Sequence, residues 1–340
     1  MTLPPRVVHH GGEQWSVRRA WPSSNGCDLE VMHADGRLRA GRWRDGRAHL
    51  LEPGVDRHLP ALAQVSAAGP VISWRRGRRI VIRANDGGGF VKVVRRETVD
   101  TITRAHERAE SFRRGFATPA LTVLDDTGAV RLSRVAGSTL FDLGADRRVS
   151  DTAVRTAWCA FSRGWERVLT APPDPDAARY TPADEAEVLV RWRDHALRAG
   201  VDPGTAAAFD RAARQLVTDP GDPSAAAHRD LHDKQILFDG DSVGLIDLDT
   251  AARAEPALDL GNLRAHVAWR LAQGRLSVAR ARGARDAIDE VTARAEVDPA
   301  RVAVYEKSTR LRLGAVYLFR PAWRTAAARW LAVEAAQTRR

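Results

Sequence analysis

The periodicity of the apolar residues changes near residue 137, and this change limits the folds open to the chain. The first part contains short runs in which apolar and polar residues alternate, such as 29–33 and 38–43 on either side of an Ala-Asp-Gly turn. In the second part, apolar residues recur three or four positions apart. Alternation is typical of half-buried strands, and the wider spacing is typical of amphipathic helices. The sequence therefore predicts a β-rich first part and a mainly helical second part.

Turn residues between the apolar runs predict three successive parts. We expect a β-rich cap over 1–60, a mixed N-lobe over 61–137 and a helical C-lobe over 138–340. The strands expected in the first two parts cover 29–33, 38–43, 71–74, 80–83, 90–94, 120–125 and 129–135, with helices over 58–68 and 99–115. The helices expected in the C-lobe cover 150–169, 184–199, 204–217, 258–273, 277–293, 299–319 and 321–336, with short strands over 236–238 and 243–246.

The composition excludes several classes of protein. Of the 340 residues, 44% are hydrophobic and 28% are charged, which is typical of a soluble globular chain. No apolar run reaches the ~18 residues that cross a bilayer, so we expect no membrane segment. The two cysteines, Cys27 and Cys159, stand in unrelated contexts that suggest neither a disulfide framework nor a zinc motif. We expect a cytoplasmic protein, and no oligomeric state is implied.

The charge of the chain is positive but unevenly distributed. The chain has 53 basic and 43 acidic residues, a net charge of +10, which on its own suggests a nucleic-acid partner. The segment 219–260 carries ten acidic residues and only three basic ones, and such a block opposes binding to a phosphodiester backbone. We therefore expect no nucleic-acid partner. An acidic segment beside Gly and His residues is better suited to a metal ion or an amine-bearing ligand.

One stretch of this acidic segment carries the chemistry. It contains His228 and Asp230, continues to Gln235 just before an apolar strand, and is followed by Asp247 at the end of the next apolar strand. Phosphoryl transfer requires a carboxylate that orients the attacking hydroxyl and accepts its proton, together with oxygen ligands for Mg²⁺. Asp230 suits the first role. Gln235 and Asp247 suit the second.

This stretch resembles the catalytic and metal loops of the aminoglycoside phosphotransferase / choline kinase family, a small-molecule branch of the protein-kinase-like fold. The segment 255–263, with its Pro and its Asp-Leu pair, is similar to the start of the helix that follows the metal loop in that family. The glutamine at Gln235, in place of the usual asparagine, and the β-rich cap are similar to the maltokinase-type subgroup. The resemblance implies an α+β, bilobal protein-kinase-like fold with a β-rich N-terminal cap and a mostly helical C-terminal lobe.

The resemblance also implies how the phosphates of a nucleotide are held. Lys92, the only lysine among the first 233 residues, lies within the third strand-like run of the N-lobe. By resemblance it is the lysine that pairs with the α- and β-phosphates. Its own partner would be a glutamate on the helix 99–115, for which Glu107 is the first choice and Glu110 the second.

The remaining nucleotide contacts follow from the same resemblance. The turn 75–78 would cover the phosphates, and the segment around Arg134 and Val135 would offer backbone hydrogen bonds to adenine. ATP and Mg²⁺ are the implied cofactors. The glycines before Lys92 do not form a phosphate-binding P-loop, because that motif requires Gly-Lys-Ser/Thr at the start of a helix and Lys92 lies inside a strand.

The function expected from these residues is that of an ATP-dependent small-molecule kinase. The acceptor would present a hydroxyl group and be a sugar, an amino sugar or an aminoglycoside-like compound. The alternative is a kinase-fold protein that binds nucleotide as a regulatory or scaffold module without transferring phosphate, and the change to Gln235 is its main support.

Overall fold

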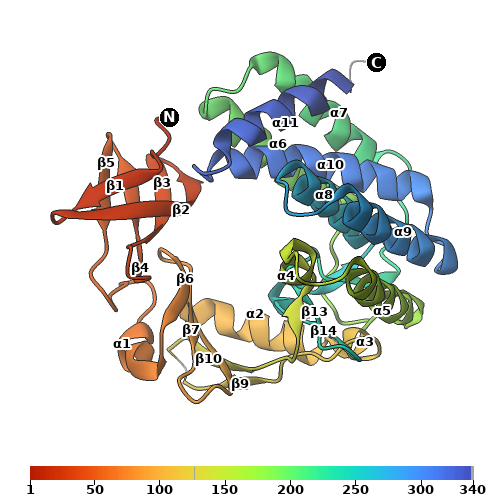
Figure 1. Ribbon diagram of the computed structural model, residues 1–340, viewed down its shortest axis with the longest axis horizontal. Helices are drawn as coiled ribbons and strands as arrows, with labels where there is room; N and C mark the ends of the chain where they lie inside the picture. The colour runs from red at the N-terminus through yellow and green to blue at the C-terminus, as the bar shows by residue number, and fades with distance from the viewer. Residues whose placement is uncertain (126, 338–340) are drawn as a thin grey trace.

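The structure of the chain is a computed structural model that describes residues 1–125 and 127–337. Strands dominate the first part and helices the second (Figure 1), so the predicted α+β class and its order of strand-rich and helical regions are confirmed. The cap, the N-lobe and the C-lobe, with the boundaries given above, are the three units that we propose for the chain. None of the helices within these described ranges combines the length and the apolar character that a bilayer crossing requires.

The cap is a single antiparallel sheet whose five strands follow one another in chain order. β3 and β4 form the predicted hairpin, in which Met32 lies opposite Leu38. The buried face of the sheet holds Trp15, Leu29 and Val31, all of them fully buried. The strands are β1 (Val7–His10), β2 (Glu13–Ser23), β3 (Gly26–Met32), β4 (Leu38–Arg44) and β5 (Arg47–Leu50).

The N-lobe is built on a second five-stranded antiparallel sheet, in the order β6-β7-β8-β10-β9. β8 is its middle strand, and Lys92 lies there opposite Val81 of β7 and Val130 of β10. The strands predicted in this part are confirmed, although β9 and β10 are shorter than expected. The elements are α1 (Leu62–Val65), a 3-10 turn (Ser66–Ala68), β6 (Val71–Arg75), β7 (Arg79–Arg83), β8 (Gly89–Val94), β9 (Leu121–Val123) and β10 (Ala129–Ser133).

The single helix predicted over 99–115 is wrong, because the structure divides it into α2 (Arg96–Glu107) and α3 (Glu110–Arg113). The chain turns between them at Arg108 and Ala109. The turn places Phe112 against Trp165 of the C-lobe, with ring centroids 6.0 Å apart. α2 therefore faces the N-lobe sheet while α3 packs on the C-lobe.

The C-lobe consists mainly of helices, and the seven helices predicted there are confirmed within a few residues at each end. Side-chain caps explain some of these ends, because the hydroxyl of Ser150 accepts the N–H of Ala153 at 3.1 Å and Thr181 begins a capping box with Asp184. The helices are α4 (Leu140–Ala145), which was not predicted, α5 (Asp151–Thr170), α6 (Pro182–Arg198), α7 (Ala206–Val217), α8 (Ala257–Ala272), α9 (Val278–Arg294), α10 (Pro299–Leu318) and α11 (Arg324–Gln337).

Two small sheets hold the acidic segment within the C-lobe. β11, β13 and β14 form one, and β12 and β15 form the other. The strands predicted over 236–238 and 243–246 are β13 and β14, whereas β11, β12 and β15 were not predicted. The elements are β11 (Ser138–Thr139), β12 (Ala225–Ala227), β13 (Ile236–Phe238), β14 (Val243–Leu245) and β15 (Ala252–Ala254), with 3-10 turns at η2 (Pro203–Thr205) and η3 (Leu248–Thr250).

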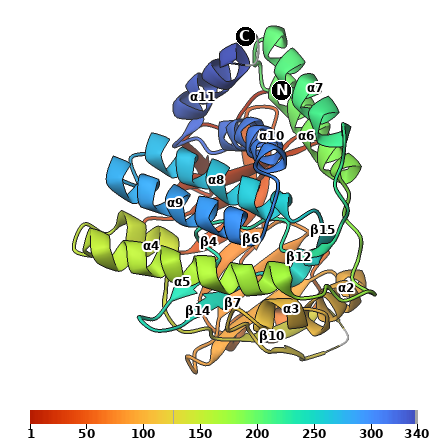
Figure 2. The same cartoon turned by 90° about the vertical axis from the view of Figure 1, so that its right-hand side faces the viewer.

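The cap contacts both lobes. Its fully buried Glu30 accepts the N–H of Trp74 at 2.9 Å and the hydroxyl of Ser73 at 3.1 Å, both on β6. At its other side, the N–H of Ala20 donates to the carbonyl of Phe319 at 2.8 Å, just after α10. In Figure 1 the three parts follow one another around a ring, and Figure 2 shows the same arrangement from its right-hand side. The cap therefore joins the end of α10 to the N-lobe sheet.

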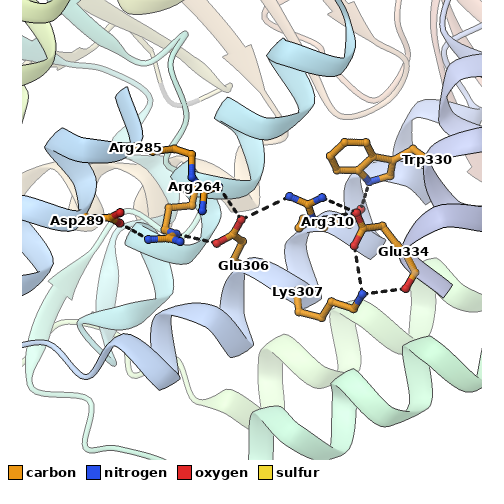
Figure 3. Close-up of polar contacts among 8 residues, drawn as sticks. All are labelled: Arg264, Arg285, Asp289, Glu306, Lys307, Arg310, Trp330 and Glu334. Atoms are coloured by element: carbon orange, nitrogen blue, oxygen red, sulfur yellow. Dashed lines mark hydrogen bonds and ion pairs between the residues drawn. The ribbon is translucent and has the colours of Figure 1, made fainter. Parts of the chain in front are cut away.

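Buried carboxylates tie helices α8 to α11 together (Figure 3). Glu306 of α10 accepts from Arg264 of α8 at 2.7 Å and from Arg285 of α9 at 3.1 Å. Glu334 of α11 is fully buried and accepts from Arg310 of α10 at 2.6 Å. Burying a carboxylate is costly unless cations pair with it, so these pairs specify how the helices meet. They hold the α10–α11 junction that contacts the cap.

Candidate active site

Asp259 of α8 holds the loop between β12 and β13. Its carboxylate accepts the N–H of His228 at 2.6 Å and the N–H of Arg229 at 2.9 Å. The side-chain amide of Asn262 donates to the carbonyl of Arg229 at 3.1 Å. Arg229 has a φ of 71°, which is strained for a residue with a Cβ atom, and these bonds maintain it. The backbone is therefore fixed at the point where Asp230 follows.

Asp230 lies in this loop with an exposed side chain. The neighbouring His228 donates from Nε2 to the carbonyl of Ile246 at 2.9 Å, and the hydroxyl of Thr250 donates to the carbonyl of His228 at 3.0 Å. These two bonds fasten the loop of Asp230 to the loop that begins at Asp247. His228 thus joins the loops, in agreement with the structural role that its burial suggests.

Asp247 contacts the predicted phosphate-binding lysine. Its Oδ1 lies 3.2 Å from Nζ of Lys92, which also donates to Asp249. The φ of Asp247 is 66°, and it and Arg229 are two of the five non-glycine residues with positive φ in the described chain. Strained backbone persists where the surrounding structure requires it, often at functional sites. The structure thus brings Lys92 and Asp247 together from the two lobes.

Electrostatics keep both carboxylates ionised. Burial raises the pKa of Asp247, but the charges of Lys92 and Arg79 lower it by more, so this pKa lies well below the ordinary value. Burial also raises the pKa of Asp249, and the imidazole of His106, 3.6 Å away, and the charge of Lys92 reverse that effect. Negative charge is therefore available here at neutral pH.

His106 is a site residue that the sequence analysis missed. It is buried on α2, and its Nε2 lies 3.6 Å from Oδ1 of Asp249. The signal was present in the sequence, because Val99, Ile102 and His106 recur at helical spacing and form the buried face of α2. His106 is therefore the side chain that α2 directs toward Asp249.

The structure does not bring either predicted glutamate to Lys92. Glu107 is exposed on α2, and Glu110 pairs with Arg113 of α3 at 3.1 Å. Within the described ranges neither glutamate contacts Lys92. The physical reason is rotation along the helix, because a residue next to His106 points about 100° away from it. Asp247 and Asp249 occupy the position beside Lys92 that was expected for the glutamate.

Gln235 is buried and serves the loop itself. Its Oε1 accepts the N–H of His232 at 3.1 Å, and its backbone carbonyl accepts the N–H of Ile246 at 3.0 Å. An amide oxygen has a second lone pair, which is what Gln235 could offer to a metal. The metal role of Gln235 stays a prediction.

The turn predicted to cover the phosphates is held from both sides. The carboxylate of Asp56 accepts the N–H of Gly77 at 2.7 Å, and Nε of Arg95 donates to the carbonyl of Gly77 at 2.6 Å. At the end of the turn, Nη1 of Arg79 lies 4.0 Å from Oδ1 of Asp247. Arg79 therefore brings one basic side chain from the end of this turn to Asp247.

The segment predicted to bind adenine connects β10 to β11. The N–H of Arg134 donates to the carbonyl of Gly88 at 3.2 Å, so this donor is used within the protein. Val135 packs against β14, where a Cβ atom on Gly244 would lie 2.3 Å from its Cγ1. The backbone N–H and C=O of Val135 form no hydrogen bond with any residue that the structure describes. Of Arg134 and Val135, it is therefore Val135 whose backbone N–H and C=O are available to a ligand.

The oxygen donors fit Mg²⁺ that binds together with a nucleotide. The side chain of Asp247 is 34% exposed, and Oδ1 of Asp249 is buried without a hydrogen bond. No cluster of three or more His, Cys, Asp or Glu residues able to hold a metal occurs over 1–125 and 127–337. Proteins usually bind Mg²⁺ through one or two carboxylates and the phosphates of a substrate. Two carboxylates are what this site provides.

Four carboxylates of the acidic segment 219–260, those of Asp233, Asp247, Asp249 and Glu255, pair with cations of the chain itself. Asp233 accepts three hydrogen bonds from Arg270, at 2.8, 2.9 and 3.2 Å, and both residues are buried. Glu255 pairs with Arg301 at 2.9 Å. The negative charge that favoured an amine-bearing ligand in the sequence thus has internal partners.

Comparison with known proteins places this site in a family. A family model described as the phosphotransferase enzyme family matches residues 75–300, whereas no curated protein matches the chain. The aminoglycoside phosphotransferase APH(3'')-Id from Streptomyces rimosus ATCC10970 is 22% identical, with a TM-score of 0.53 over 76% of this chain and 96% of that one. The choline kinase LicA from Streptococcus pneumoniae is 11% identical, with a TM-score of 0.53 over 81% and 97%. ADP-bound aminoglycoside phosphotransferase APH(2'')-Ib is also 11% identical, with a TM-score of 0.53 over 79% and 93%. The kinase-like fold expected from the sequence is confirmed.

Proposed function

The chain belongs to the phosphotransferase enzyme family, and on this basis we propose that it transfers the γ-phosphate of ATP to a hydroxyl group of a sugar, an amino sugar or an aminoglycoside-like acceptor. Membership makes the protein a phosphotransferase that acts on hydroxyl groups of small molecules. The donor nucleotide, the metal, the acceptor and the role of each residue belong to the proposal.

The observation that carries the proposal is the contact between Lys92 and Asp247, 3.2 Å between Nζ and Oδ1, beside the loop of Asp230. In the proposal, Asp230 orients the acceptor hydroxyl and accepts its proton, and Lys92 pairs with the α- and β-phosphates. Most of the rate in phosphoryl transfer comes from such positioning and charge stabilisation.

The remaining roles follow from the positions of the other predicted residues. Asp247 and Gln235 would hold Mg²⁺, which supplies charge neutralisation at the phosphates when bound. Val135, and less directly Arg134, would accept the adenine at the connection between the lobes. Asp249 and His106 orient the side chain of Lys92 from the other side.

A second candidate function is nucleotide binding without phosphotransfer, in a regulatory or scaffold protein. Its support is the hydrogen bond from the N–H of His232 to Oε1 of Gln235 at 3.1 Å, which engages the oxygen expected to bind metal. Such a protein would bind ATP, and Asp230 would have no proton to accept.

The deciding experiment is Mg²⁺-dependent ATP turnover with a panel of sugars, amino sugars and aminoglycosides, with the mass increase of each acceptor as the readout. We expect one class of acceptor to gain a phosphoryl group, and we expect Asp230→Ala and Asp247→Ala to abolish turnover with folding intact. ATP binding with no phosphorylated acceptor across the panel would favour the second candidate. Turnover retained in both variants would refute the assigned roles.

A further inference from the structure

Two arginines, Arg75 of the N-lobe and Arg320 of the C-lobe, contact the ring of Trp21, and Lys234 acts on the same tyrosine, Tyr317, as Arg320 does. Arg75 ends β6, Arg320 follows α10, and Lys234 lies in the loop of Asp230. None of the three forms an ion pair with a carboxylate among the residues that the structure describes, although most other arginines of the site do. Positive charge therefore remains unbalanced on this side of Asp230.

Trp21 of the cap joins two of these cations. The guanidinium carbons of Arg75 and Arg320 lie 5.1 and 5.3 Å from the centroid of its ring. Nε of Arg75 is buried without a hydrogen-bond partner, and Nη1 of Arg320 donates only to backbone carbonyls, including Ala20 at 2.6 Å. A cation–π contact stabilises each guanidinium but leaves its charge in place. Two like charges held against one ring are therefore suited to receiving an anion.

The ionisation of neighbouring groups indicates the same positive potential. Burial raises the pKa of Tyr317, yet Arg270, Lys234 and Arg320 lower it by more, so this pKa lies below the ordinary value. Burial is also the main reason why the pKa values of Arg75 and Arg320 fall to about 10. The shift of Tyr317 is therefore the one that neighbouring positive charge produces, whereas the shifts of the two arginines mainly report their burial.

The carboxylates nearest to this region are already engaged. Asp233 accepts three hydrogen bonds from Arg270. Glu30 accepts the N–H of Trp74 and lies 3.6 Å from Nε of Arg19. Asp28, Glu30 and Asp233 raise the pKa values of Arg75, Arg320 and Lys234 respectively, but burial and neighbouring cations outweigh them, so these carboxylates offset the positive charge only in part. A polycationic acceptor would meet uncompensated positive charge here, which opposes its binding.

We infer that the acceptor of this enzyme is a small hydroxyl compound that also carries an acidic group, a carboxylate or a phosphate, bound by Arg320, Arg75 and Lys234. The inference rests on the proposed function and narrows its acceptor class. Guanidinium groups bind carboxylate and phosphate oxygens in pairs of parallel hydrogen bonds. The acceptor oxygen forms a bond to the γ-phosphorus, the bond from that phosphorus to the leaving oxygen of ADP breaks, and the hydroxyl proton passes to Asp230.

The test compares four acceptors that share one ring: glucose, glucosamine, glucuronate and glucose 6-phosphate. We expect at least one of the two acids to have a kcat/KM about tenfold or more above that of glucose and of glucosamine, which is the size of effect expected from a charge-assisted hydrogen bond. Arg320→Gln is expected to raise the KM of that acid about tenfold or more and to leave the KM of ATP unchanged. Glucuronate carries a carboxylate and glucose 6-phosphate carries a phosphate, so a comparison of the two shows which acidic group the protein prefers.

Arg6→Gln is the matched control. Nη2 of Arg6 donates to the carbonyl of Ala322 at 3.1 Å, so this variant also removes a bond between the cap and the α10–α11 junction, but it removes no cation from the region of Trp21. We expect its acceptor preference to match that of the unaltered protein. Lys234→Gln provides a second variant if Arg320→Gln does not fold.

Three results would overturn the inference: a preference for glucosamine over both acids, an equal loss for acidic and neutral sugars in Arg320→Gln, or the same loss in Arg6→Gln. If no sugar is phosphorylated, the proposed function fails, and calorimetric binding of the four sugars to the ADP-loaded protein decides the inference separately. Acid-selective binding that Arg320→Gln abolishes supports it, and its absence refutes it.

Discussion

Nζ of Lys92 lies 3.2 Å from Oδ1 of Asp247, although 155 residues separate the two in the chain. Lys92 belongs to the middle strand of the N-lobe sheet, and Asp247 begins the turn after β14 in the C-lobe. Asp249 accepts from the same ammonium group and is contacted in turn by His106 of α2. The buried charge of Lys92 therefore connects the N-lobe sheet to Asp247 and Asp249, and Asp249 in turn connects it to α2. A change to any member of this cluster affects the others.

Lys92→Met removes that charge and leaves two carboxylates without their cation. We expect ATP turnover to fall by about 10²–10³-fold, which is typical when a preorganised group that stabilises transition-state charge is removed. The pKa values of Asp247 and Asp249 should rise, because the charge of Lys92 lowers both. Steady-state turnover measures the first effect, and the pH dependence of thermal unfolding measures the second. A variant with turnover within a few-fold of the unaltered protein would show that Lys92 does not contact the phosphates.

Asp230→Asn tests the proton acceptor. The side chain of Asp230 is exposed, so an isosteric amide should leave the fold and nucleotide binding unchanged. We expect kcat to fall by about 10²–10⁴-fold, the range for loss of a general base. Asp239→Asn is the control, since Asp239 lies in the adjacent β13–β14 turn and accepts from Ser242. Equal losses in the two variants would contradict a catalytic role for Asp230.

The periodicity of apolar residues predicted the strands and helices that have one apolar and one polar face. Apolar and polar residues largely alternate along the sequences of β3 and β4, and the long helices of the C-lobe have apolar stripes. The strand Ala225–Ala227 was missed because three alanines contain no alternation to detect, and Ala252–Ala254 was missed because a single Ala-Arg-Ala is too short to show one. The break between α2 and α3 was missed because the apolar spacing continues through Ala109 to Phe112. Only the contact of Phe112 with Trp165 explains the turn.

The spacing of the motif identified Asp230, Gln235 and Asp247 as candidates, because short loops beside neighbouring strands carry all three. The partner of Lys92 could not be found in this way. Whether Glu107 or His106 faces the site depends on how α2 is rotated against the metal loop, and that rotation is set by burial of Ile102 and its neighbours. Asp259 likewise binds a loop about 30 residues before it, a contact that no local pattern reveals.

His106→Phe and Glu107→Ala form a matched pair on α2. His106 is buried 3.6 Å from Asp249, and Glu107 is exposed one residue later. We expect His106→Phe to lower kcat by about tenfold, because Asp249 loses a polar neighbour and orients Lys92 less firmly. Glu107→Ala should change kcat by less than about twofold, as is usual for exposed positions. The reverse order of effects would restore the glutamate predicted from the sequence.

Glu334→Ala tests the helix network of Figure 3. Glu334 is fully buried, and its removal takes away the carboxylate of Lys307 and the nearer of the two carboxylates that pair with Arg310, which keeps Glu306 at 3.5 Å. We expect the free energy of unfolding to fall by about 2–4 kcal/mol, as when one member of a buried ion pair is lost. Urea unfolding measures this change. Glu290→Ala, which removes an exposed pair with Arg294 on α9, should cost only about 0.5 kcal/mol. Similar losses in both variants would show that the network contributes no more than a surface pair.

Asp259 should give turnover an acidic limit. Burial raises the pKa of Asp259 to about 6, even though its hydrogen bonds favour the ionised form. Above that pH both oxygens accept backbone N–H groups, from His228 and Arg229. A proton on either oxygen displaces one of these donors and loosens the loop of Asp230, so kcat should fall about tenfold per pH unit below 6.

The fold itself should persist, because a folded-state pKa above the unfolded value of about 3.9 means that proton uptake at this group favours the folded state as the pH falls. Profiles of kcat and circular dichroism from about pH 5 to 8 measure both. Asp259→Asn should be slow throughout and lack the step near 6, whereas a step that survives in this variant would assign the titration to His232, whose pKa burial lowers.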